Sequence, residues 1–428
     1  MTTSNDKRKT RWAVPFFTIW IGQALSLVGS RAGGFALVWW LTKRSGSGTV
    51  LATATMVAMI PQVFLGPFIG ALVDRWNRRA IMLVADTFIA ILSAWLAYLF
   101  WIDALQIWHI YVIMFLRALG GTFHHPAMQA STSLMVPEDQ LTRVAGMNQT
   151  LQGVMNIVTP PLGAFLMSIL PLHWIMIIDV ITAVFAIGPL LFVIIPQPLK
   201  RQVATDEQEA KPNLWRDVRE GFLYIWHWPG MLMLLTMATL LNFLIHPGMS
   251  LLPLLVTRHF EGDALQLGWL NSAWGAGIII GGLVLSAWGG FRKRIVTSLV
   301  GIAGMGAGFL LVGLAPATAF WLATVALFLA AIMNPITNGP IFAILQNTIA
   351  PDMQGRVFMI VGSIAGLAAP LGLAVAGPVS DKLGVGAWFL VGGVMSILVS
   401  VIAPFVPAIM QIEEQRQAHI EPVKSATE

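Results

Sequence analysis

Apolar runs long enough to cross a lipid bilayer recur along the 428 residues of this chain. A helix needs about 20 residues to cross the hydrocarbon core, because each residue adds about 1.5 Å to its length. Only 11% of the residues are charged, whereas soluble domains average about 25%. We therefore expect an all-α polytopic membrane protein with twelve transmembrane helices. The expected spans are 14–41, 50–73, 80–102, 107–135, 144–170, 174–196, 231–257, 265–288, 295–315, 318–349, 357–380 and 386–410.

The basic residues are distributed unequally between the two sides that this topology defines. With twelve spans, both termini lie on one side, and that side contains 19 of the 25 Lys and Arg residues. The opposite side contains four: Lys43, Arg44, Arg258 and Lys382. Because cytoplasmic connections are enriched in Lys and Arg, we expect a multi-pass protein of the cell (inner) membrane with both termini in the cytoplasm. The same bias explains the net charge of +5 without a nucleic acid partner.

Several chemistries have no matching residues in this sequence. There is no Cys, which excludes disulfides and cysteine metal sites. No phosphate-binding Gly-x-x-x-x-Gly-Lys-Ser/Thr run is present to bind ATP. The sequence also lacks a channel selectivity filter and a His-Glu-x-x-His or other hydrolytic set. We therefore expect neither an enzyme nor a protein with a bound metal or cofactor.

An internal repeat with an offset of half the chain length relates the two parts of the sequence. Pro137 and Pro351, which follow the fourth and tenth spans, are 214 residues apart, and Arg143 and Arg356 are 213 apart. Two parallel six-helix halves explain this agreement. A polar stretch between the sixth and seventh spans would connect them. The expected division is an N-terminal half over 1–196, a cytoplasmic linker over 197–230 and a C-terminal half over 231–428.

The connection between the second and third spans is short and densely charged, with the sequence Gly-Ala-Leu-Val-Asp-Arg-Trp-Asn-Arg-Arg from position 70. It resembles the signature loop of the major facilitator superfamily, Gly-x-Leu-x-Asp-Arg-x-x-Arg-Arg. Asn77 replaces the usual Gly, and Asn tolerates a left-handed turn. The alternative role for the arginines is to anchor the topology and bind anionic lipids. The resemblance implies a cytoplasmic latch between the halves, formed by Gly70, Asp74, Arg75 and Arg78.

Charges inside the spans are the second group of candidate residues. Arg117 lies about ten residues, or ~15 Å, into the fourth span, where an unpaired cation costs several kcal/mol. Its Arg-Ala-Leu-Gly-Gly surroundings are similar to the family's fourth-helix motif, which implies proton coupling through Arg117 with Asp86 or Asp179. Backbone carbonyls are the alternative partners of Arg117. We also expect Arg31 and Asp179, both in the outer half, to pair with each other, unless Asp179 serves only in helix packing.

Polar and aromatic residues within the spans are candidates for the wall of a large, weakly polar cavity. Imidazole groups titrate near neutral pH and are natural proton carriers, although a hydrogen-bonded structural role is the alternative for His124. The second half supplies amides and aromatic rings within its spans but no acid. The candidates are His124, Asn242, His246, Trp274, Asn334 and Asn338.

Looser motifs narrow the resemblance to the drug:proton antiporter group, which includes macrolide-efflux and enterobactin-export proteins. They are the segment 21–30 (Ile-Gly-Gln-Ala-Leu-Ser-Leu-Val-Gly-Ser), Val38-Trp39-Trp40 and Ile178-Asp179. The resemblance implies a monomeric secondary transporter that exports a bulky, largely hydrophobic, drug-like or macrolide-like compound through the bilayer by proton antiport and alternating access. A lipid flippase, a nutrient symporter and a non-transporting membrane sensor remain open alternatives.

We expect Asp74→Asn to leave folding largely intact and to cripple transport, because a topology signal needs no acid in the loop whereas a latch does. Transport of a lipophilic dye into proteoliposomes under an imposed pH gradient measures the effect, and a size-exclusion profile controls for folding. Unimpaired transport by this variant would leave the loop as a topology anchor only.

Overall fold

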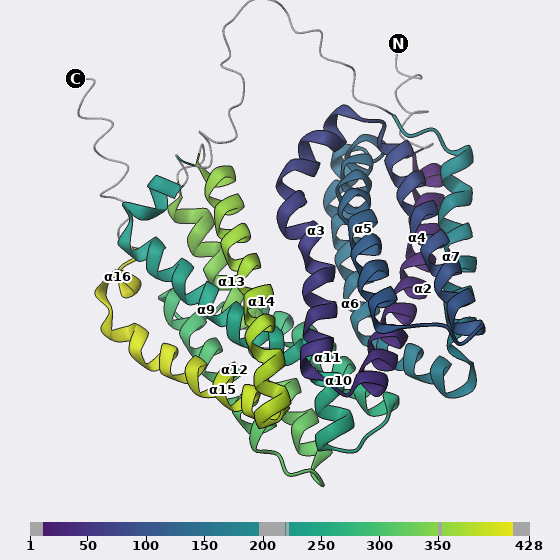
Figure 1. Ribbon diagram of the computed structural model, residues 1–428. Coiled ribbons are helices and arrows are strands. Elements are labelled where there is room, and N and C mark those ends of the chain that lie inside the picture. The colour runs from purple at the N-terminus through teal and green to yellow at the C-terminus, as the bar shows by residue number, and fades with distance from the viewer. Residues whose placement is uncertain (1–11, 197–218, 220–221, 350–352, 414–428) are drawn as a thin grey trace, which may run out of the picture. The chain divides into compact units, whose positions relative to one another are not determined.

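The computed structural model describes residues 12–196, 219, 222–349 and 353–413, and those residues form helices and connecting turns without a β-strand (Figure 1). The side chains of Pro67, Gly70, Ala71, Asp74 and Arg75 also lie outside the description. Within the described ranges, twelve helices have 18 or more residues. They are α2 (Ala13–Ser45), α3 (Gly48–Arg75), α4 (Arg78–Trp101), α5 (Ile107–Met135), α6 (Glu138–Ile169), α7 (Leu172–Phe192), α9 (Pro229–Ser250), α11 (Ala264–Trp288), α12 (Arg294–Leu314), α13 (Phe320–Thr348), α14 (Gln354–Leu383) and α15 (Val385–Ile402).

These helices confirm the expected all-α membrane fold. Ten of them, counted over the described residues, are long and apolar enough to cross a bilayer. The other two, α5 and α6, contain polar residues in their central turns, such as Arg117 and Gln152. The expected run 231–257 is interrupted, because α9 ends at Ser250 and continues as α10 (Leu252–Leu254) and the π-helical turn η1 (Leu255–His259). The last run likewise ends in two short turns, η2 (Ala403–Phe405) and α16 (Pro407–Met410).

Local sequence explains where the first helices begin and end. Gly46 ends α2 in the left-handed region, with φ of 57°, a conformation that glycine adopts without strain. Asn77 precedes α4 with φ of −69° and ψ of 110°, and its Oδ1 accepts a hydrogen bond from the backbone N–H of Ala80 at 3.2 Å. Asn77 therefore does not adopt the left-handed conformation that its residue type tolerates. This amide instead caps the N-terminus of α4, where backbone N–H groups have no partner within the helix.

The chain divides into two compact units, and each is described by itself. Unit 1 comprises Met1–Gly46, Thr53–Val203 and Gly262–Ser272, and unit 2 comprises Ser47–Ala52, Ala204–Glu261 and Ala273–Glu428. The first residues of α3 thus group with unit 2, and the first residues of α11 group with unit 1. The two halves expected from the repeat, 1–196 and 231–428, remain a proposal.

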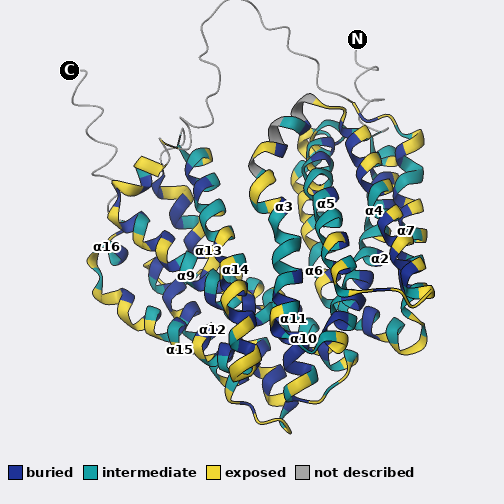
Figure 2. Cartoon of the chain, in the orientation of Figure 1, coloured by how far each residue is buried: buried dark blue, intermediate teal, exposed yellow. Residues whose placement is uncertain are grey.

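In unit 1, α2 packs against α5, α6 and α7, and α4 packs between α5 and α7. Figure 1 shows these helices running in nearly parallel directions. Small residues allow the close approach of α2 to α7: a Cβ atom on Gly22 would lie 2.2 Å from the carbonyl oxygen of Phe185. Large apolar residues such as Val184 and Phe192 are exposed, and Figure 2 shows exposed positions along the helices of this unit. Exposed apolar area on this scale is typical of a lipid-facing surface.

In unit 2, α12 packs against α13 and α15, and α9 packs against α14 and α15. The contact between α12 and α15 is tightest at two facing glycines. A Cβ atom on Gly393 would lie 2.6 Å from the backbone nitrogen of Leu310 and 2.8 Å from the carbonyl oxygen of Gly306. Its neighbour Gly392 has more room, because a Cβ atom there would lie 3.4 Å from the carbonyl oxygen of Leu244.

We expect Gly393→Ala to lower the thermal stability of the protein, at a cost of roughly 1–3 kcal/mol for overpacking. Gly392→Ala is the matched control, because it makes the same change in helix propensity at the adjacent position without a close contact. Intrinsic Trp fluorescence during heating in detergent measures both. Equal melting temperatures for the two variants would contradict the tight α12–α15 contact.

Candidate functional site

Unit 1 contains a buried carboxylate that is held by a cation and two hydroxyl groups. Asp179 in α7 is 1% exposed, and its Oδ2 lies 2.8 Å from Nη1 of Arg117 in α5. Ser93 of α4 donates to the same oxygen at 2.8 Å, and Ser30 of α2 donates to Oδ1 at 2.8 Å. Arg117 also donates to the hydroxyl of Ser93. Four helices of the unit thus meet at one neutralised ion pair.

The expected pair between Arg31 and Asp179 is wrong. Arg31 instead donates to Oε1 of Gln152 at 2.5 Å and to Oδ1 of Asn156 at 2.6 Å, both in α6. The reason is the direction of the side chain around α2. Successive residues of a helix point about 100° apart, so Ser30 reaches α7 while Arg31 reaches α6. Similar depth in the membrane was therefore insufficient to identify the partner.

A second buried carboxylate lies in the same unit. Asp86 of α4 is 6% exposed, and its Oδ2 accepts a hydrogen bond from Nε2 of Gln23 at 2.7 Å. Nε2 of His124 in α5 lies 3.2 Å from Oδ1. The angles of this contact do not form a hydrogen bond, and that nitrogen has no hydrogen-bond partner among the described residues. The contact is therefore electrostatic, and its strength depends on whether the imidazole is protonated.

The two carboxylates thus differ in the kind of cation beside them. Asp179 faces the guanidinium of Arg117. Asp86 faces the imidazole of His124, which carries a charge only when it is protonated and whose side chain is 18% exposed. Of the two partners expected for Arg117, the structure brings it together with Asp179 and not with Asp86.

The side chains of Gly70, Asp74 and Arg75 lie outside the described residues, so their part in a latch remains a prediction. Arg78 is buried, and its Nη1 donates to the carbonyl oxygen of Ala130 at 2.9 Å. The neighbouring Arg79 donates to the carbonyl oxygens of Leu190 at 2.5 Å and of Leu191 at 2.6 Å. These carbonyls lie in the last turn of α7, where such groups lack partners within the helix. Both arginines therefore bind helix carbonyls of unit 1.

The cavity candidates of the second half do not form a polar cluster among the described residues. Asn242 and Asn338 each donate to a carbonyl of their own helix, at 2.8 Å and 3.0 Å. Trp274 packs edge-on against Phe309, with 6.3 Å between ring centroids. His246 is exposed, and Asn334 is partly buried. Their role in binding therefore remains a prediction.

Two apolar pockets lie elsewhere, one in each unit. The pocket of unit 1 has a volume of about 770 Å³ and is lined by residues of α4 and α5 together with Trp76, whose ring stacks on Phe123 at 6.4 Å. The pocket of unit 2 has a volume of about 520 Å³ and is lined by α9, Ile364 and the helical segment 222–226. Both volumes suit a drug-sized molecule. None of the six cavity candidates is among the residues that line them.

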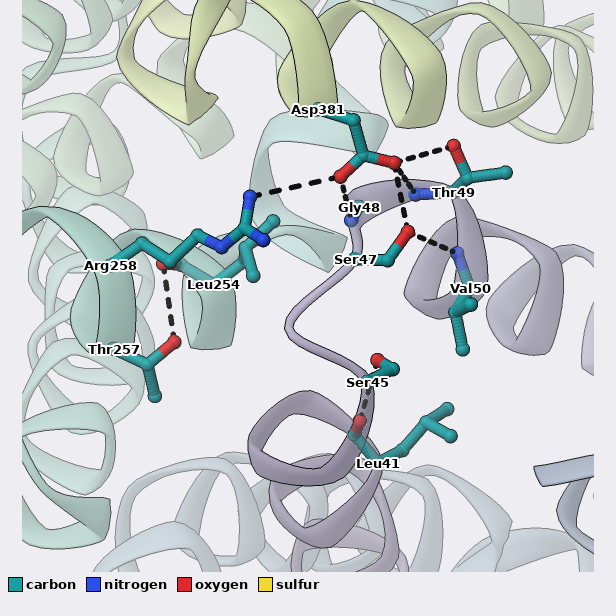
Figure 3. Close-up of polar contacts among 10 residues, drawn as sticks. All are labelled: Leu41, Ser45, Ser47, Gly48, Thr49, Val50, Leu254, Thr257, Arg258 and Asp381. Carbon is teal, nitrogen blue, oxygen red and sulfur yellow. Dashed lines mark hydrogen bonds and ion pairs between the residues drawn. The ribbon is translucent and has the colours of Figure 1, made fainter. Parts of the chain in front are cut away.

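Unit 2 contains a hydrogen-bonded carboxylate, Asp381, that was not predicted from the sequence (Figure 3). Asp381 and the groups that contact it are called the Asp381 cluster. Oδ1 of Asp381, near the end of α14, accepts from the backbone N–H of Gly48 at 2.6 Å. Oδ2 accepts from the backbone N–H and hydroxyl of Thr49 at 3.0 and 2.7 Å and from the hydroxyl of Ser47 at 2.8 Å. Arg258 approaches Oδ1 at 3.9 Å.

Asp381 thus caps the N-terminus of α3, where the helix dipole favours negative charge. The Ser-Gly-Thr start of α3 suggests a cap, but no local pattern identifies a partner more than 330 residues away.

The comparisons with known proteins agree with this architecture. The model of the Major Facilitator Superfamily matches residues 19–373 and 248–425. Macrolide efflux protein A of Streptococcus pyogenes is 35% identical over 407 residues, which cover 95% of this chain and 99% of that protein. The protein of the same name from Enterococcus faecalis is 36% identical over 328 residues, which cover 77% and 100%. Multidrug efflux pump Tap of Mycolicibacterium fortuitum is 26% identical over 408 residues, which cover 91% and 95%.

Solved structures show the same fold at low sequence identity. A bacterial homologue of the iron transporter ferroportin superposes with a TM-score of 0.70 at 14% identity, covering 91% of this chain and 98% of that one. A D-xylose-proton symporter superposes with a TM-score of 0.65 at 12% identity, covering 92% and 98%. At such low identity the likeness shows the fold alone.

We expect Asp179→Asn to destabilise the protein by roughly 3–5 kcal/mol, because the guanidinium of Arg117, whose side chain is 14% exposed, would lose its counterion. Adding Arg117→Gln should recover part of the loss, whereas adding Arg31→Gln should not. Thermal unfolding in detergent measures the three variants against the unmodified chain. Recovery with Arg31→Gln and none with Arg117→Gln would contradict the observed pairing.

Proposed function

Because the chain belongs to the Major Facilitator Superfamily, we propose that it is a secondary transporter that exports a bulky, largely hydrophobic compound of the macrolide or drug class in exchange for protons. The relatives named for macrolide efflux and multidrug efflux, matched over most of their length, support the class of substrate. The buried contact between Asp86 and His124 is the single observation on which the proton part of the proposal rests.

Exchange requires a group that binds a proton in one step of the cycle and loses it in another. The Asp86–His124 pair meets this requirement, because protonation of the imidazole strengthens the contact whereas protonation of the carboxylate weakens it. Gln23 remains a hydrogen-bond donor to Asp86 in either state. A change in the charge of this pair alters the contact between α4 and α5. The Arg117–Asp179 pair stays ionised in this proposal and holds the four helices together.

The proposal also includes a latch on the cytoplasmic side and a topology with both termini in the cytoplasm. Gly70, Asp74, Arg75 and Arg78 fasten the cytoplasmic side, and release of this latch permits alternating access. The excess of Lys and Arg in alternate connections supports cytoplasmic termini. The working unit is a monomer, with an N-terminal half over 1–196, a linker over 197–230 and a C-terminal half over 231–428.

The test uses purified protein in proteoliposomes with a macrolide as substrate and an imposed pH gradient. We expect gradient-driven macrolide movement, and a loss of roughly tenfold or more in Asp86→Asn, because the amide binds no proton at neutral pH. Dissipating the gradient with a protonophore should reduce transport by the unmodified protein to the level of this variant.

The matched control is Asp103→Asn. Asp103 lies in an exposed turn with φ of 53°, a conformation that Asn also tolerates. Asp103→Asn neutralises one carboxylate, as Asp86→Asn does, but at a solvent-exposed position. This variant should transport normally. Macrolide movement at the same rate with and without the gradient would contradict proton antiport, and no movement at all would contradict macrolide export.

A further inference from the structure

Arg31 is a cation inside a membrane-spanning helix, and no acidic side chain pairs with it among the described residues. Two pairs of ionisable residues lie within the spans of unit 1, Asp179 with Arg117 and Asp86 with His124. Within the described part of the chain, the ligands of Arg31 are the amide oxygens of Gln152 and Asn156. These ligands satisfy part of its hydrogen-bonding capacity but leave its charge uncompensated.

The partial exposure of Arg31 and the polar residues around it indicate that it faces water and not lipid. Arg31 and Gln152 are partly exposed, and Asn156 is exposed. A charged or amide side chain that faces lipid in the hydrocarbon core costs several kcal/mol, so such residues face a water-filled cavity or the protein interior. Gln152 and Asn148 stand four and eight residues before Asn156, on the same face of α6. The indole Nε1 of Trp20 in α2 donates to Oδ1 of Asn148 at 2.7 Å. A polar strip therefore follows the contact between α2 and α6.

The chemistry of the group indicates what it binds. A guanidinium has five N–H donors, and the two amides of α6 accept from two of its nitrogens. The remaining N–H groups, together with the full positive charge, favour oxygen acceptors such as carbonyl, ester and hydroxyl groups. The same charge repels a compound that is permanently cationic at this position.

We propose that Arg31, oriented by Gln152 and Asn156, is a substrate-binding subsite for the oxygen acceptors of the exported compound and a filter against permanently cationic compounds. The inference rests on the proposed function, since the substrate class is the one proposed above. A macrolide is a lactone with further carbonyl and hydroxyl groups, and it therefore presents the acceptors that this subsite requires. Gln152 and Asn156 act as positioning residues, because they fix the guanidinium without neutralising it.

The test neutralises Arg31 without removing it. Gln152→Glu puts a carboxylate oxygen where the amide oxygen now lies 2.5 Å from Nη2, so the hydrogen bond is kept and the free charge is lost. We expect the affinity for a macrolide to fall roughly tenfold or more, the size of effect typical of a hydrogen bond to a charged group. We expect the affinity for ethidium, a permanent cation, to rise. Binding to purified protein in detergent, followed by Trp fluorescence or calorimetry, measures both.

Asn148→Asp is the matched control, because it adds the same charge on the same face of α6 while keeping an acceptor for Trp20. It should change macrolide affinity less than twofold. If Gln152→Glu fails to fold in a size-exclusion test, Asn156→Asp makes the same change at the other ligand of Arg31 and carries the same expectation.

The outcomes separate this inference from the proposed function. Unmodified protein that neither binds nor transports a macrolide would contradict the proposed function and with it the subsite. Normal macrolide binding by the unmodified protein together with unchanged affinity in Gln152→Glu would overturn the subsite alone. An equal loss in Asn148→Asp would also overturn it, because the effect would then be a general response to added negative charge.

Discussion

A charge inside a membrane must be neutralised or hydrated, and the interior of unit 1 is arranged around this requirement. Asp179 meets it completely: a guanidinium and two hydroxyl groups surround the carboxylate, and each comes from a different helix. Such a pair contributes little net stability compared with an apolar core, but breaking it leaves a buried charge. The Arg117–Asp179 pair therefore determines which helices lie next to each other and how each helix is rotated about its own axis.

The other two charged groups meet the same requirement in ways that leave them chemically responsive. Asp86 has an amide donor and an imidazole, so its environment changes with the protonation of His124. The ligands of Arg31 among the described residues are two neutral amide oxygens, which do not compensate its positive charge. Unit 1 thus contains a carboxylate–guanidinium pair, a carboxylate–imidazole pair and a cation without an acidic partner among the described residues. In the proposed exchange of protons for an organic compound, the first pair holds the helices, the second binds the proton and Arg31 binds the substrate.

The sequence predicted features that depend on residue type and spacing. Apolar runs located the long helices to within a few residues at most boundaries, because a span must be both long and apolar whatever its neighbours are. Arg117, Asp86 and Asp179 were identifiable as important because charges in such runs are rare. Depth along a span also follows from counting. What counting cannot supply is the direction of a side chain around the helix, and this is why Arg31 was assigned to Asp179 and not to Gln152 and Asn156.

Two other features were not predicted from the sequence, for a different physical reason. Asn77 stands where the signature loop usually has Gly, and its amide satisfies an N–H group at the start of α4 in an extended conformation. The Asp381 cluster depends on residues from α14 and the start of α3, and nothing local to either segment specifies the other. Long-range partners of this kind need either many related sequences or three-dimensional coordinates to be recognised.

The distance along the chain between Asp381 and the start of α3 has a consequence for biogenesis. The hydroxyl of Ser47 and the backbone N–H of Gly48 are 334 and 333 residues away from the carboxylate that accepts their hydrogen bonds. A ribosome adds roughly 5–20 residues per second, so on the order of 20–70 s separate the synthesis of the two ends of this contact. During that interval the translocon or the lipid headgroups must accommodate the polar start of α3. This cap is therefore among the last contacts that the nascent protein can complete.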